Sequence, residues 1–166
     1  MEWVDRILAV TGRHGTPGQR DWTGVESAVG TTLPEDFKEL WRYFSDGSFA
    51  DYLFLLQPEG GPDSVAGNHE SLLAHLRQNP ETRIYQPYGL FGDAHEGSEV
   101  GLLQWGISEG DDEYYWLADT HTDPAHWPVI ARTDPLERFH RFDMPASAFI
   151  HRVLTDPDFR PFTIAT

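Results

Sequence analysis

The sequence predicts an α+β fold in which helices come first, a mainly antiparallel sheet follows and one helix closes the chain. Three observations lead to this prediction. Apolar residues recur at helical spacing before residue 47, short apolar runs alternate with turn residues between 102 and 142, and helical spacing returns after Pro145. The length of 166 residues suits a single domain over 1–166, and 39% hydrophobic with 13% aromatic residues is enough for a core.

Three helices are expected in the N-terminal part. The first covers residues 3–8 and ends near Gly12, and the second runs from about 22 to 29 and stops at Gly30. The third follows Pro34, because proline is tolerated in the first turn of a helix. The apolar positions of this third helix, spaced i, i+3, i+4 and i+7, are Phe37, Leu40, Trp41 and Phe44.

The middle of the chain predicts less regular structure. Residues 52–56 form a short apolar run typical of a buried strand, and a helix is expected over about 70–78, before Asn79-Pro80. Residues 80–99 are rich in glycine, proline and acids, so we expect a loop with one short strand near Ile84-Tyr85.

The C-terminal half predicts four strands and a helix. Strand-like runs at 102–107 and 113–117 are separated by Ser-Glu-Gly-Asp-Asp, which is typical of a hairpin. Residues 129–132 and 136–142 predict two further strands. The last helix opens at Pro145, and its apolar positions are Ala148, Phe149, Val153 and Leu154.

Charge is unevenly placed along the chain. The sequence has 27 acidic and 12 basic residues, a net charge of −15, and residues 51–125 alone carry 14 acids and two bases. A field of one sign repels phosphate backbones and anionic lipids, so we expect neither nucleic-acid nor membrane binding. The same field would speed association with a cationic partner, and solubility alone is the alternative explanation.

Cysteine is absent, which excludes disulfides, cysteine zinc sites and thiol nucleophiles. No basic and then apolar leader follows Met1, and no apolar run approaches the ~20 residues that a membrane span needs. We therefore expect a soluble, cytoplasmic protein.

Gly106-Ile-Ser108-Glu-Gly110 matches the G-x-S-x-G nucleophile elbow of hydrolases, and Asp119 and His126 follow in a suitable order. A nucleophile elbow requires a helix after the serine, whereas residues 111–117 predict a returning strand. A hairpin loop is therefore the favoured interpretation, and a small hydrolase that uses Ser108 is the alternative.

Two groups of polar residues, one that contains histidines and one of acids, are potential metal sites. The histidines lack the helical spacing of H-E-x-x-H, and the acids lack the spacing of a calcium loop. The first group is His121, His126, Asp119 and Asp123, with His69 and His75 as a separate pair, and the second is Asp93, Glu96, Glu99 and residues 111–113. We expect polar loop residues here, with no metal, no cofactor and no catalytic residue.

Six tryptophans suggest either a sugar-binding surface or a core. Trp3, Trp22 and Trp41 lie on apolar helix faces, and Trp105 and Trp116 lie within predicted strands. A core role is favoured for these five, and Trp127, in a predicted turn, is left open.

The sequence resembles the SUKH superfamily, which contains bacterial toxin-immunity proteins and the fungal Smi/Knr regulators of cell-wall synthesis. The N-terminal motif is Trp22-x-x-Val-Glu26-x-x-x-Gly30-x-x-Leu33-Pro34-x-Asp-Phe37-Lys, running to Phe44-x-x-Gly47. The second half has Gly101-Leu-Leu-x-Trp105-Gly106, then Gly110-Asp-Asp-x-Tyr-Tyr-Trp116-Leu, then Pro124-x-x-Trp127-Pro128-Val129, and a terminal helix around Phe149. Residues 58–99 and those after Leu154 depart from the pattern.

The resemblance implies an α+β fold, no cofactor and, in most members, a role as an immunity protein that binds and neutralises a toxin domain. With the negative charge of residues 51–125, the expected partner is a cationic toxin domain, such as a nuclease. The candidate contact residues are Glu96, Glu99, Glu109, Asp111, Asp112 and Glu113. The alternative is a regulatory or scaffold protein of the Smi/Knr type that acts in cell-wall or signalling control.

Overall fold

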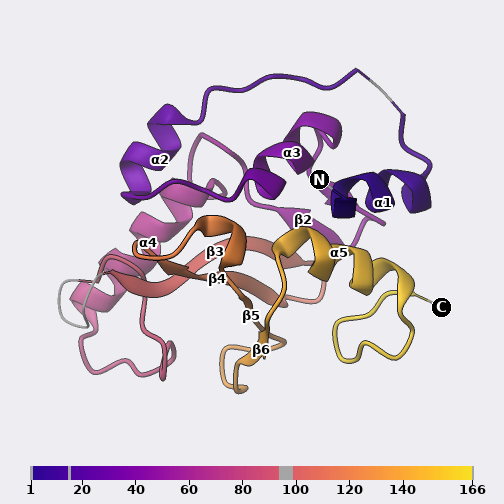
Figure 1. The fold of residues 1–166 in the computed structure, drawn as a ribbon. Coiled ribbons are helices and arrows are strands. Elements are labelled where there is room, and N and C mark those ends of the chain that lie inside the picture. The colour runs from indigo at the N-terminus through magenta and orange to yellow at the C-terminus, as the bar shows by residue number, and fades with distance from the viewer. Residues whose placement is uncertain (1, 15, 94–98, 166) are drawn as a thin grey trace.

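The computed structural model describes residues 2–14, 16–93 and 99–165 (Figure 1). Over these residues the chain forms five α-helices, one short 3₁₀ helix and a six-stranded antiparallel sheet, as the predicted α+β class requires. The elements are α1 (Glu2–Thr11), α2 (Thr23–Val29), α3 (Glu35–Tyr43), β1 (Ser48–Phe49), β2 (Leu53–Leu55), α4 (Val65–Gln78), β3 (Val100–Ser108), β4 (Glu113–Asp119), the 3₁₀ helix (Pro124–His126), β5 (Val129–Arg132), β6 (His140–Phe142) and α5 (Ala146–Thr155).

The strands lie side by side in the order in which they occur in the sequence, β1 to β6, and every neighbouring pair is antiparallel. In such a sheet successive connections alternate between its two ends. The connections β1–β2, β3–β4 and β5–β6 therefore share one end, which we call the hairpin end. The segment that contains α4 and the β4–β5 connection lie at the opposite end.

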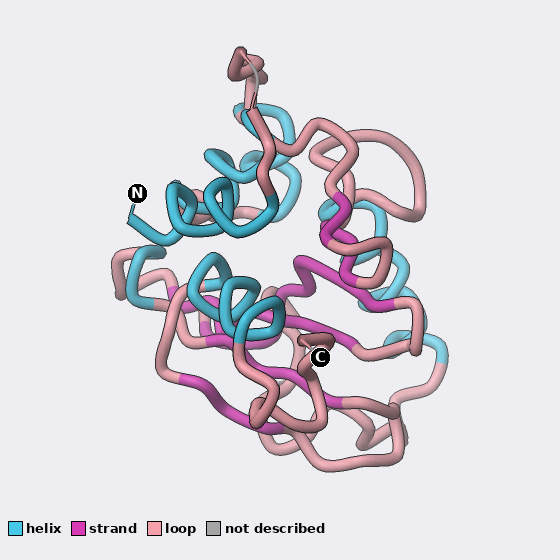
Figure 2. Tube along the Cα trace, turned by 90° about the vertical axis from the view of Figure 1, so that its right-hand side faces the viewer, coloured by secondary structure: helices cyan, strands magenta, loops and turns pink. Residues whose placement is uncertain are grey.

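The main core fills the space between one face of the sheet and the helices. Figure 2 shows several of the helices stacked above the strands, with a further helical segment beside them at the right. Trp105 and Trp116 of the sheet contact this core, and Phe149 of α5 lies edge-on to Trp105 with ring centroids 6.0 Å apart. Trp41 and Trp127 are only 2% exposed, so the predicted core role is confirmed for Trp41 and extends to Trp127. Trp22 is half-buried and packs against the core, whereas Trp3 is half-buried against His151 and is not part of the core cluster.

A smaller core covers part of the second face of the sheet. Leu102, Tyr115 and Ile130 point to this face and contact the loop between α4 and β3. Half-buried side chains of α4 pack against the same cluster, and these are Leu72, Leu73 and Leu76. The helix predicted over about 70–78 is therefore present, and these three leucines face the sheet.

Most predicted elements are confirmed, and three differ. The prediction of a strand near Ile84-Tyr85 is wrong, because these residues form turns; Tyr85 is buried and Ile84 is half-buried against the second face of the sheet. The last strand spans only His140–Phe142, since residues 133–139 form an exposed connection in which Leu136 is 91% exposed. α4 begins at Val65, five residues before the predicted start, and Ser64 caps it by accepting a hydrogen bond from the amide of Gly67.

The helices that the structure describes are too short or too polar to cross a lipid bilayer.

Candidate partner-binding surface

The three connections of the hairpin end lie next to one another. The amide of Glu109 donates to the carbonyl of Tyr52 at 2.7 Å, which joins the β1–β2 and β3–β4 turns. A groove lined by Gly110 and Thr133 joins the β3–β4 turn to the β5–β6 connection. Segments that are distant in the sequence, 50–52, 109–112 and 133–139, therefore form one surface.

Backbone strain concentrates in the turns of this surface. Within the described residues, the non-glycine residues with positive φ are Ala50, Asp51 and Asp111, at 55°, 51° and 64°, and all three lie at the hairpin end. A side chain in the left-handed region costs about 1–2 kcal/mol, although aspartate tolerates it better than alanine. Strained residues of this kind are enriched at functional sites.

Asp112 does not point outward with its neighbours. It is 5% exposed, and its Oδ2 accepts hydrogen bonds from Ser108 Oγ at 2.7 Å and from Tyr52 Oη at 3.0 Å. Ser108 Oγ in turn accepts from the amide of Asp112 at 2.9 Å. Burial is the main cause that raises the pKa of Tyr114, and the negative charge of Asp112 raises it further. This phenol therefore stays protonated beside the carboxylate. This network holds the β3–β4 turn closed.

Glu113 also has an internal partner. Both of its oxygens accept from the guanidinium of Arg132, at 3.0 and 3.3 Å, and the Arg132 side chain is 1% exposed. The Arg132 guanidinium lies 4.3 Å from the ring centroid of Phe139 and also donates to the carbonyl of Ile84. Arg132 therefore ties β4 to the β5–β6 connection and to the loop over the second face.

The six predicted contact residues do not form one surface. Glu109 and Asp111 are exposed at the hairpin end, whereas Glu99 precedes β3, and nine strand residues place it about 30 Å away. There Glu99 pairs with the exposed His121 at 2.8 Å and raises its pKa. Glu96 lies outside the described residues.

Further acids that the sequence reasoning missed join Glu109 and Asp111. All are exposed, and none forms an ion pair with any residue that the structure describes: they are Asp51, Asp134 and Glu137. The exposed Arg138 adds one positive charge beside them. The alternation of strand connections, which brings residues 51 and 134–137 to the end that holds 109–111, was the signal that could have found them.

Ser108 is the last residue of β3, and the element that follows it is strand β4, not a helix, so the hairpin predicted over residues 102–117 is confirmed. Its hydroxyl is engaged by Asp112 and backbone amides, without a histidine among its described partners. The described residues contain no group of three or more histidines and acids placed to hold a metal ion.

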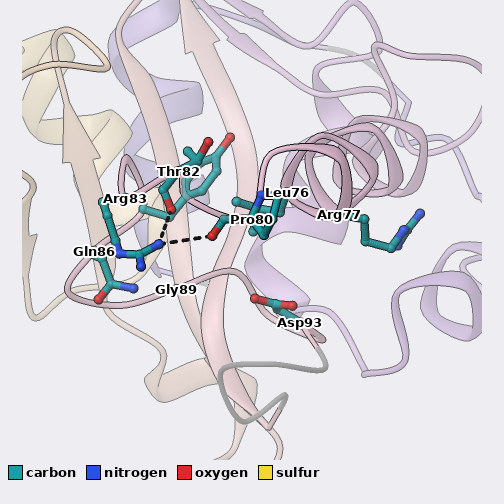
Figure 3. Close-up of a pocket in the computed structure, with 9 residues that line it drawn as sticks. Leu76, Arg77, Pro80, Thr82, Arg83, Gln86, Gly89 and Asp93 are labelled. Carbon is teal, nitrogen blue, oxygen red and sulfur yellow. Dashed lines mark hydrogen bonds between the residues drawn. The ribbon is translucent and has the colours of Figure 1, made fainter.

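A separate cavity of about 150 Å³ lies between the end of α4 and the following loop (Figure 3). Its lining includes Arg77 and Arg83, which are the two basic residues of the acidic segment 51–125. Arg83 turns toward Pro80 and Thr82 and donates to both carbonyls, at 3.1 and 3.2 Å, while Arg77 points away and pairs with Glu70. Both arginines therefore already have partners within the chain. The hairpin end, whose exposed acids form no ion pair with a described residue, is the stronger candidate for a partner-binding surface.

Comparisons with family models, with curated proteins and with solved structures give no match to this chain.

Proposed function

We propose that this domain binds a cationic protein and neutralises it, in the manner of the SUKH immunity proteins. The proposal rests on the placement of charge: the antiparallel sheet brings exposed acids from three connections to its hairpin end, where none of them forms an ion pair with a residue that the structure describes. Unscreened acids of one sign speed the encounter with a basic surface. They also disfavour phosphate backbones and anionic lipid as ligands.

The resemblance to the SUKH motif supports the immunity role. The motif residues stabilise the fold. Trp22 packs edge-on against Phe37 with ring centroids 5.8 Å apart, and Gly30 ends α2 with a φ of 83°. Gly101 leaves room for a neighbouring backbone, because a Cβ there would lie 2.5 Å from the amide nitrogen of Phe91. Such residues define a scaffold, and a partner would be chosen by the connections that the scaffold presents.

Affinity capture followed by a growth assay tests this function. The tagged chain is expected to retain a basic protein domain from lysate of the source cells at about 0.05 M salt and to release most of it at about 0.5 M. Co-expression of the chain with that domain is then expected to restore growth that the domain alone prevents. Capture of a cell-wall or signalling protein, with no rescue from any toxin, would favour the regulatory role instead.

A further inference from the structure

A groove of about 460 Å³ opens at the hairpin end, between the β3–β4 turn and the start of the β5–β6 connection. Ile107 and Pro135 contribute apolar surface to it, and the exposed Asp111 and Asp134 contribute carboxylates. Its volume is in the range of sites that hold a small ligand or a few side chains of a partner.

Apolar side chains are exposed at this groove. A bulge between Gln104 and Gly106 shifts the register of β3, so that Ile107 lies opposite Glu113, on the second face of the sheet. The cluster of buried residues that covers this face does not include Ile107, which is 39% exposed. Leu136, directly after Pro135, is 91% exposed. Exposed apolar surface rimmed by polar residues is typical of a protein-binding site.

Charge decides which occupant fits. Among the described residues that line the groove none is basic, and Arg132 beneath it is already paired with Glu113. A second copy of this chain would bring the same carboxylates against one another, and a purely apolar segment would strip water from Asp111 and Asp134 without replacing it. An arginine or lysine meets both needs, because its stem is apolar and its head is cationic.

We propose that this groove receives a basic segment of the partner protein. A cationic head is held by Asp111 and Asp134, its stem lies on Ile107 and Pro135, and an adjacent apolar residue of the segment covers Leu136. The proposal rests on the proposed function and adds to it the place and the chemistry of the main contact.

Amide chemical-shift mapping of the ¹⁵N-labelled chain tests the groove. The probe is a short peptide of alternating leucine and arginine, and the matched probe has glutamate in place of each arginine. The arginine probe is expected to shift the amides of Gly110, Asp111, Thr133 and Leu136, and the glutamate probe is expected to shift none of them. Equal shifts with both probes, or shifts spread evenly over the acidic surface, would overturn the proposal.

Two variants make the test quantitative. D111N/D134N keeps a local acceptor at both positions and is expected to weaken binding of the arginine probe about tenfold, or about 1.4 kcal/mol. L136S is expected to weaken it less and to leave the fold intact, since the side chain is exposed. The control E59Q/E81Q removes the same charge from exposed acids elsewhere and is expected to change the affinity little. A control that weakens binding as much as D111N/D134N contradicts a specific groove.

The outcomes also separate the groove from the function. If growth rescue by the chain survives both D111N/D134N and L136S, the groove proposal is wrong and the function stands. If the groove binds the probe as described but the chain captures no basic protein, the proposed function is wrong.

Discussion

Arg132 makes several of the contacts that hold the hairpin end together. Its side chain is 1% exposed, and the guanidinium donates hydrogen bonds to Glu113 and to the carbonyls of Ile84 and Pro135. The guanidinium also lies over the ring of Phe139. Removing one partner of such a buried pair leaves an uncompensated charge. We expect Glu113→Gln to lower the free energy of unfolding by about 3 kcal/mol, measured by urea denaturation. The double variant E113Q/R132M should lose less than the sum of the two single variants, and additive losses would show that the pair is not coupled.

His69 gives the fold a pH dependence of defined sign. Its Nε2 lies 2.7 Å from the carbonyl of Phe91, and its buried Nδ1 has no hydrogen-bond partner among the residues that the structure describes. Burial lowers the pKa of His69 below that of the unfolded chain, although the Phe91 carbonyl and Glu70 oppose this. The unfolded state therefore binds the proton more readily, and stability that is present above about pH 6.5 falls as the pH drops below it.

Urea denaturation at several pH values between about 7.5 and 5 tests this dependence. His69→Gln is expected to flatten the loss of stability toward acid, and the exposed His126→Gln serves as the control. An unchanged slope in His69→Gln would mean that other groups carry the effect.

The residue scale is also where the sequence misleads most about the candidate site. The six acids were grouped because four of them, 109 and 111–113, are near neighbours in the chain. The structure turns Asp112 into the turn network and Glu113 toward Arg132, a partner 19 residues away. Which of several adjacent acids faces solvent depends on strand register and on long-range partners, and neither is encoded in local charge.

At the scale of elements, the packing of β3 depends on Gly101 as well as on the neighbouring strands, because the loop after α4 lies directly against this glycine. A Cβ at Gly101 would lie 2.5 Å from the Phe91 amide nitrogen, and that backbone is fixed because the amide donates to the carbonyl of Leu102 at 3.0 Å. We expect Gly101→Ala to lower the melting temperature through a loss of about 1–3 kcal/mol. The control Gly24→Ala adds a methyl group to α2, where nothing lies within 4 Å, and should be neutral or stabilising. A stable Gly101→Ala would show that the loop can move away.

Elements set by local pattern were predictable, and elements set by tertiary contacts were not. The β3–β4 hairpin and α3 follow from alternation, turn residues and helical spacing that lie within a few residues. β1 spans two residues and exists only through its pairing with β2. Ile84 and Tyr85 are apolar because they cover a sheet and not because they form a strand. The cap at Ser64 was a usable signal for the start of α4, but Gly67 and Asn68 weakened the helical pattern after it.

The molecule as a whole carries a net charge of −15, and the fold concentrates part of it at the hairpin end. Like charges repel in the folded state more than in the expanded unfolded chain. Screening should therefore stabilise the protein, and the free energy of unfolding should rise as salt increases from about 0.01 to about 0.15 M. A flat or falling dependence would contradict net self-repulsion.

Two variants with equal changes in net charge test whether the charge is concentrated where the structure places it. D51N/E109Q/E137Q neutralises three exposed acids of the hairpin end, and D5N/E59Q/E81Q neutralises three exposed acids from separate parts of the chain. Because repulsion grows as distance falls, the first variant should reduce the salt dependence of the unfolding free energy more than the second. Equal reductions would mean that the acids of the three connections are no closer to one another than the rest, and the surface on which partner binding is proposed would lose its electrostatic basis. A larger reduction in the first variant supports a concentrated field without any partner being present, so this measurement can precede the search for one.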